Sequence, residues 1–85
     1  MTMIDANGID NACFDQRQGV TGYDVADVDA LLRLAAFTLV YPADPHALTA
    51  DEVRRWRLHE APGGYDMSQV DDLLDQIIVA LDGKD

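Results

Sequence analysis

The chain has 85 residues, 48% of them hydrophobic and 26% charged, and its 16 acidic and six basic side chains give a net charge of −10. This length fits one small domain or two very short repeats, and the apolar content is typical of a folded chain. The negative field repels phosphates and anionic lipids, so we expect no nucleic acid partner, and membrane binding is disfavoured.

Cysteine usage and the apolar segments indicate a cytoplasmic protein. Cys13 is the single cysteine, so no intrachain disulfide is expected. The first five residues lack the basic and apolar regions of a signal peptide. The most apolar window covers residues 34–41 and is far shorter than the ~20 residues of a membrane span.

An internal repeat is the strongest signal in the sequence. When the chain is shifted by 42 residues, Phe14 falls on Trp56 and no gap is needed beyond that pair. The same shift aligns Gly22-Tyr23-Asp24 with Gly64-Tyr65-Asp66, and Val28-Asp29 with Val70-Asp71. Two copies are fewer than a solenoid needs. We therefore predict one compact domain made of residues 1–42, the more degenerate copy, and residues 43–85.

The first copy predicts a short helix, a turn and a long helix. Asn7 is the expected N-cap of the short helix, and Asp24 is that of the long helix. Residues 41–45, which include two prolines, end the long helix and link the copies. The apolar face of the long helix recurs at helical spacing and comprises Val28, Leu31, Leu32, Ala35 and Leu39.

The second copy follows the same plan more closely. Thr49 and Glu52 have the spacing of a capping box, and the short helix that they begin is expected to point Val53 and Trp56 to one side. Residues 61–64 contain one proline and two glycines and predict a turn. Asp66 is the expected N-cap of the second long helix, whose apolar face comprises Val70, Leu73, Leu74, Ile77, Ile78 and Leu81.

The predicted fold class is all-α, because no segment shows the alternation of a strand. We expect two tandem short helix–turn–long helix repeats packed as a pseudo-twofold helical domain. The 25 residues between the long helices are long for a simple hairpin, which favours long helices that run in parallel. An antiparallel pair stays open.

The two Gly-Tyr-Asp triplets are interpreted as conformational. Glycine permits a positive φ in the turn, tyrosine packs on the following valine, and aspartate caps the helix. The helix dipole accounts for the other acids near the helix starts.

Cys13, His46 and His59 are too dispersed for metal ligation. We expect no enzymatic activity, no cofactor and no metal.

The second copy has the order Leu48-Thr49, Val53, an aromatic residue, Gly64-Tyr65-Asp66 and Val70-Asp71. This order resembles the N-terminal domain of the DivIVA family of bacterial cell-division and polar-growth scaffolds. It covers residues 48–82, and a weaker form covers residues 7–40. Tandem copies are similar to the small DivIVA-domain repeat proteins of actinobacteria. The resemblance implies an α-helical scaffold whose partners are proteins, either a second copy of itself or a DivIVA-type coiled coil.

In that family, the domain binds the inner face of a curved membrane through an apolar and a basic residue just before the Gly-Tyr-Asp triplet. The matching positions here are Val20-Thr21 and Pro62-Gly63, which supply no basic side chain and no large aromatic ring. We therefore expect these four residues to contribute to an interaction surface, and we do not expect them to bind a membrane as the family does.

Arg54, Arg55, Trp56 and Arg57 form the one basic cluster. It could be a patch for an acidic partner or a membrane surface. We favour a buried Trp56 flanked by arginines that pair with nearby acids, because the surrounding field is negative.

The leading hypothesis is a cytoplasmic DivIVA-like scaffold or adaptor linked to cell division or polar growth, which reaches membranes only through its partners. Two alternatives stay open. One is a membrane-curvature-binding domain that uses residues 54–57. The other is an acidic regulatory or inhibitor module with a continuous anionic face.

Overall fold

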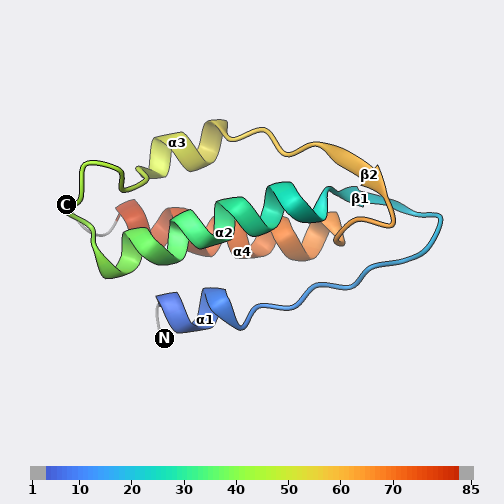
Figure 1. Ribbon diagram of the computed structural model, residues 1–85, viewed down its shortest axis with the longest axis horizontal. Coiled ribbons are helices and arrows are strands. Elements are labelled where there is room, and N and C mark those ends of the chain that lie inside the picture. The colour runs from blue at the N-terminus through green and yellow to red at the C-terminus, as the bar shows by residue number, and fades with distance from the viewer. Residues whose placement is uncertain (1–3, 83–85) are drawn as a thin grey trace.

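The computed structural model describes residues 4–82 and contains, within that range, four helices and two short strands (Figure 1). The helices are α1 (Ala6–Asp10), α2 (Val25–Val40), α3 (Ala50–Arg55) and α4 (Met67–Asp82). The strands are β1 (Thr21–Tyr23) and β2 (Glu60–Pro62). Each copy therefore contributes a short helix, a strand and a long helix, in that order.

The long helices begin at the predicted caps. The carboxylate of Asp24 accepts a hydrogen bond from the N–H of Asp27 at 3.1 Å, and that of Asp66 accepts one from the N–H of Gln69 at 3.0 Å. These bonds satisfy N–H groups that have no partner within the first turn of a helix. At the other end of α2, Tyr41 is the C-cap and Pro42 follows it.

The short helices are capped differently. The capping box predicted in the second copy is confirmed, with Thr49 and Glu52 exchanging hydrogen bonds of 3.0 and 3.1 Å. The prediction of Asn7 as a cap is wrong, because Asp5 caps α1 by accepting from the N–H of Gly8 at 2.8 Å. Starting the helix two residues earlier places Ile9 on its buried face.

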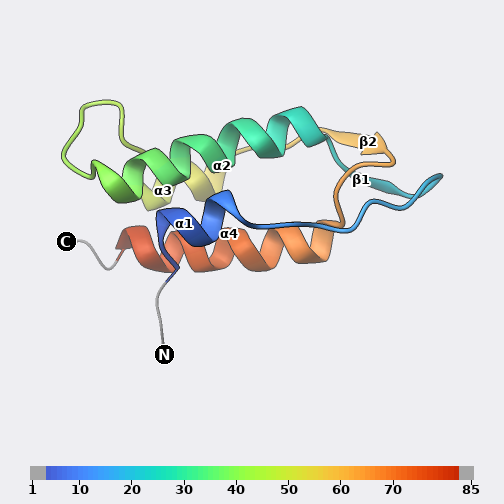
Figure 2. The same ribbon diagram turned by 60° about the horizontal axis from the view of Figure 1, so that its bottom comes forward.

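The two long helices lie side by side and run in the same direction, as Figures 1 and 2 show from two angles. This is the orientation that the length of the linker favours. The short helices flank the pair on opposite sides, with α1 packed against α2 and α3 packed against α4. The N-terminal ends of α2 and α4 meet the strands at one end of the molecule.

The all-α prediction is wrong because β1 and β2 form a two-stranded antiparallel sheet. The described residues are 54% helical, and each copy contributes three residues to the sheet. The register pairs Thr21 with Pro62, Gly22 with Ala61 and Tyr23 with Glu60. Strands of three residues are too short to show alternation, and each contains a glycine or a proline that argues against a strand. Pairing between the copies creates these strands.

The two copies are not related by a single shift. Met67 follows Val25 by 42 residues at the start of the long helices, but Thr49 follows Asp5 by 44 at the short-helix caps. The first copy therefore holds two extra residues in the segment before its tyrosine. The N–H of Asp24 donates to the carbonyl of His59 and that of Asp66 to the carbonyl of Asp15, so Asp15 and His59, 44 residues apart, are equivalent and Phe14 corresponds to Leu58. The predicted match with Trp56 is wrong.

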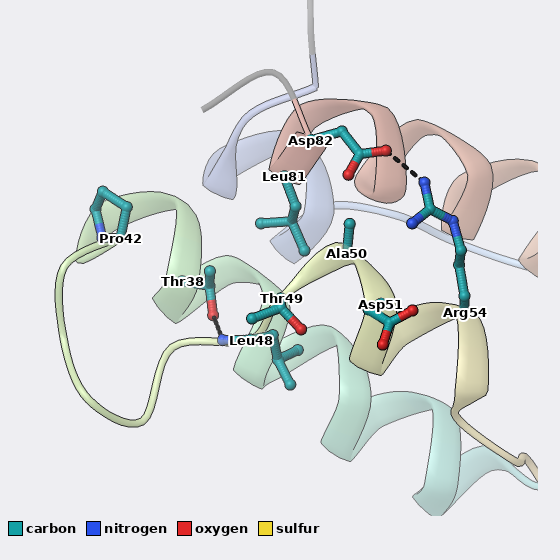
Figure 3. A pocket seen from close by; sticks show the side chains of 9 residues that line it. All are labelled: Thr38, Pro42, Leu48, Thr49, Ala50, Asp51, Arg54, Leu81 and Asp82. Atoms are coloured by element: carbon teal, nitrogen blue, oxygen red, sulfur yellow. Dashed lines mark hydrogen bonds and ion pairs between the residues drawn. The ribbon is translucent and has the colours of Figure 1, made fainter. Parts of the chain in front are cut away.

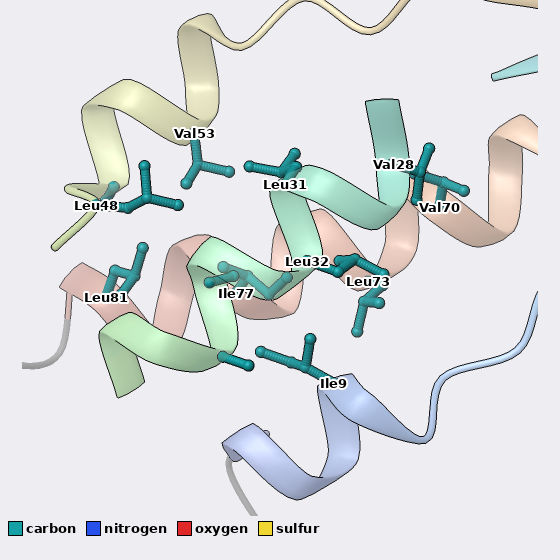
Figure 4. Packing of buried hydrophobic residues seen from close by; sticks show 13 residues of the cluster. Ile9, Val28, Leu31, Leu32, Leu48, Val53, Val70, Leu73, Ile77 and Leu81 are labelled. Carbon is teal, nitrogen blue, oxygen red and sulfur yellow. The ribbon is translucent and has the colours of Figure 1, made fainter. Parts of the chain in front are cut away.

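One apolar cluster holds the four helices together (Figure 4). Ile9 of α1, Leu31 of α2, Val53 of α3 and Ile77 of α4 all contribute, and each is at most 3% exposed. Thr38 is the one buried polar side chain in the described range. Its hydroxyl accepts a hydrogen bond from the N–H of Leu48 at 2.8 Å and donates one to the carbonyl of Leu34 at 2.8 Å, so it is fully satisfied.

Candidate functional site

The two Gly-Tyr-Asp triplets, which are far apart in the sequence, lie directly against each other. The N–H of Tyr23 donates to the carbonyl of Tyr65 at 2.9 Å, and the N–H of Tyr65 donates to the carbonyl of Tyr23 at 2.9 Å. This reciprocal pair of hydrogen bonds relates equivalent residues of the two copies. An approximate twofold axis therefore passes between the two tyrosines.

The tyrosine side chains repeat this exchange. The hydroxyl of Tyr23 donates to Asp71 at 2.8 Å, and that of Tyr65 donates to Asp29 at 3.1 Å. The hydrogen bond to Asp71 is the main cause that raises the pKa of Tyr23 to about 12. Burial, followed by the hydrogen bond to Asp29, raises the pKa of Tyr65. Both Val-Asp motifs therefore supply acceptors to the opposite copy.

The N-terminus of α2 is also held by the second copy. The N–H of Asp24 donates to the carbonyl of His59 at 2.7 Å. Asp27 in turn accepts from the backbone N–H of His59 at 3.0 Å and lies 2.6 Å from its ring Nδ1. These hydrogen bonds, the backbone one first, lower the pKa of Asp27.

The N-terminus of α4 is held by the first copy in the same way. The N–H of Asp66 donates to the carbonyl of Asp15 at 2.8 Å. Gln69, which stands where α2 has Asp27, accepts from the N–H of Asp15 at 2.7 Å and donates to its carboxylate at 3.0 Å. The side chains at the third position of both long helices thus bind the opposite copy.

Gly22 and Gly64 cross at the centre of this network. A Cβ on either residue would lie 2.3 Å from a tyrosine carbonyl oxygen of the opposite copy. The two glycines are therefore required by close backbone approach. The expectation that they adopt a positive φ is wrong, because Gly19 and Gly63 are the described residues that do so.

The predicted motif residues around the crossing are structural as well. Val28 and Val70 are fully buried. The ring of Phe14 lies 5.1 Å, between ring centroids, from that of Tyr65, at a tilt of 49°. Together with the hydrogen bonds above, these contacts leave few of the motif atoms free to bind a partner.

The four residues predicted just before the triplets come together at one end of the molecule. The N–H of Gly63 donates to the carbonyl of Val20 at 2.9 Å, and Thr21 pairs with Pro62 in the sheet. Val20 is 53% exposed at this tip. These four residues, two from each copy, therefore lie together at one tip.

The arginine cluster lies elsewhere, at the C-terminal end of α3. Arg54 pairs with Asp82, and Arg55 pairs with Asp51 at 2.6 Å, so the expected pairing with nearby acids is confirmed for both. The expectation of a buried Trp56 is wrong, because its side chain is 37% exposed. Trp56 and Arg57 line a shallow groove of about 650 Å³ between α3 and α4.

A second hollow of about 400 Å³ lies near the C-terminal ends of α2 and α4 (Figure 3). Thr38, Leu48 and Leu81 form its floor, and the ion pair of Arg54 with Asp82 closes one side. Because the Thr38 hydroxyl is already bonded to Leu48 and Arg54 is paired, these groups do not point to a ligand.

Sequence reasoning missed an apolar surface on α2. Leu34, Phe37, Val40 and Tyr41 are 36–58% exposed, although they belong to the most apolar window of the chain. The signal was present, because apolar residues occupy both faces of the helix in residues 34–41. A helix that is amphipathic against one core requires only one such face.

The described residues 4–82 contain no helix that is long and apolar enough to cross a membrane. In the same range, no group of three or more His, Cys, Asp and Glu side chains is placed to hold a metal ion. In comparisons with known proteins, no family model, no curated protein and no solved structure matches the chain.

Proposed function

We propose that the protein is a non-enzymatic scaffold or adaptor that acts by binding other proteins in the cytoplasm. The reciprocal network at Tyr23 and Tyr65 is the observation that carries this proposal. It accounts for the repeated motif as a device that joins two copies into one rigid unit. Three of the acids near the helix starts, Asp27, Asp29 and Asp71, are engaged in contacts between the copies.

The link to cell division or polar growth rests on the resemblance of the two repeats to the DivIVA N-terminal domain. A chain that carries two such copies forms, within itself, a pair with approximate twofold symmetry. We propose that this unit binds a DivIVA-type coiled coil of the same cell and reaches the membrane through that partner.

The two alternatives have less support. A membrane site at residues 54–57 would need free basic side chains, but Arg54 and Arg55 are paired with acids. Of the acids that would form an anionic face, Asp24 and Asp66 cap helices and Asp71 accepts from Tyr23. Each of these contacts occupies a charged or hydrogen-bonding group that an outside partner would otherwise bind.

The test is a binding titration of the purified chain with a purified DivIVA-type coiled-coil protein from the same organism. Saturable binding, together with a fluorescent fusion that gathers at division sites or cell poles, is the expected result. No binding at about 100 μM and a diffuse fusion would overturn the proposal. Flotation with small anionic vesicles at low salt and at about 0.3 M salt tests the membrane alternative separately.

A further inference from the structure

The outward face of α2 is an uncovered apolar surface. Seven large apolar side chains are exposed among residues 4–82, and four of them lie here: Leu34, Phe37, Val40 and Tyr41. In Figure 1, α2 lies in front of α4 and no other element covers its outer side, and Figure 2 agrees. The rings of Phe37 and Tyr41 also contact each other, with centroids 5.2 Å apart.

The equivalent face of α4 is different. Val79 stands 42 residues after Phe37, but its outward neighbours include the exposed acids Asp71, Asp72 and Asp75. Residues 30–43, which cover the last 11 residues of α2 and the three that follow it, contain one charged side chain, Arg33, and no acid. In a chain of net charge −10, such a stretch is where a second chain of the same charge meets least repulsion.

A stripe of residues along this face of α2 can pack against the same stripe of a second copy. Ala30, Leu34, Phe37 and Tyr41 are all exposed and follow each other at intervals of four, three and four residues, which places them on one face of the helix. When two such helices pack antiparallel about a twofold axis between residues 35 and 36, Leu34 faces Phe37 of the second copy. In the same alignment, the small Ala30 faces the large Tyr41.

We propose that this face binds a second copy of the chain, forming a twofold symmetric dimer through antiparallel α2 helices. The dimer goes beyond the scaffold role proposed above and does not depend on it. From Ala30 to Tyr41 the stripe is about 17 Å long. Two helices in contact over that length bury less than the ~1,200 Å² of a standard interface, so we expect a dissociation constant on the order of 10–100 μM.

Sedimentation equilibrium of the whole chain from about 10 μM to about 1 mM tests the proposal. We expect a monomer–dimer equilibrium that becomes tighter as salt rises from about 0.05 to 0.5 M, because salt screens the repulsion between two acidic chains. Phe37→Lys and Tyr41→Lys should each lower the association constant at least about tenfold. The helical circular dichroism signal of each variant, compared with that of the unchanged chain, checks that the variant is folded.

The matched control is Val79→Lys, which makes the same kind of change at the equivalent exposed position of α4. It should alter the association constant by no more than about twofold. A monomer at every concentration would overturn the proposal. So would a dimer that Val79→Lys weakens as much as Phe37→Lys does, or one that salt dissociates.

Discussion

Substitution of the crossing glycines by alanine is expected to separate the two copies. A Cβ on Gly22 would lie 2.3 Å from the carbonyl oxygen of Tyr65, and one on Gly64 would lie 2.3 Å from that of Tyr23. The atoms in the way belong to the backbone, so no side-chain rotation relieves the overlap. Ordinary contact begins at 3.4 Å, so the two segments must move apart by about 1 Å.

That movement breaks identifiable contacts. The reciprocal backbone bonds between Tyr23 and Tyr65, each 2.9 Å long, would lengthen to about 4 Å and be lost. Two such bonds contribute about 1 kcal/mol each, and one tyrosine–carboxylate bond contributes a further 1.5–3 kcal/mol or so. Gly22→Ala or Gly64→Ala should therefore lower the free energy of unfolding by about 3.5–5 kcal/mol, which is a large part of the roughly 4–13 kcal/mol expected for a domain of 85 residues.

Urea unfolding followed by circular dichroism measures this change. Gly63→Ala is the matched control, because Gly63 has a φ of 73° but a Cβ added there would meet nothing within 4 Å. The control should lose only about 1–2 kcal/mol. If Gly22→Ala and Gly64→Ala cost no more than Gly63→Ala, the crossing is not what holds the copies together.

Three further predictions test single contacts. Because the pKa of Tyr23 is raised to about 12, the folded state keeps a proton that the unfolded state releases near pH 10, so stability should fall from about pH 10 to pH 12. Urea unfolding across that range should show a smaller fall in Tyr23→Phe, and an unchanged slope would contradict this. Because its bonds to His59 lower the pKa of Asp27, the stability that they contribute is present above about pH 4 and is lost as the pH falls further. Thermal melts of Asp27→Asn should lack that part of the acid loss, whereas a wild-type profile would refute the assignment. Thr38→Val leaves the buried N–H of Leu48 without an acceptor and should lower the free energy of unfolding by about 1–3 kcal/mol in urea, and a loss under about 0.5 kcal/mol would contradict it.

The long helices could be predicted from the sequence because their determinants are local. Asp24 and Asp66 cap them, and apolar residues recur at helical spacing along each one. The capping box of Thr49 and Glu52 is local in the same sense. Each signal lies within a few residues of the structure that it specifies.

The contacts between the copies could not be predicted in the same way. The gapless alignment was fixed by the identical Gly-Tyr-Asp triplets, which hid the two extra residues before Tyr23. It therefore matched Phe14 with Trp56 in place of Leu58 and shifted the cap of α1 from Asp5 to Asn7. The strands escaped detection because each exists only through pairing with a segment about 40 residues away.

The proximity of four candidate surface residues could be predicted from the sequence. The sequence grouped Val20, Thr21, Pro62 and Gly63 as a surface, and the structure places these residues at one tip. The hydrogen bonds of the two tyrosine hydroxyls to Asp71 and Asp29 were missed, because nothing in the local pattern shows which acid a tyrosine hydroxyl will reach. The apolar outer face of α2 was missed because residues 34–41 were compared only with the length of a membrane span and were not assigned to helix faces.

Native-state hydrogen exchange at the amides of Tyr23 and Tyr65 tests most directly whether the two copies form one interlocked unit. Each amide donates to the other tyrosine's carbonyl, so both should exchange together, and as slowly as the amides at the buried Leu31 and Ile77 of the long helices. If both tyrosine amides exchange as fast as that of the exposed turn residue Gln18 while the long helices stay protected, the copies are not joined at the motif.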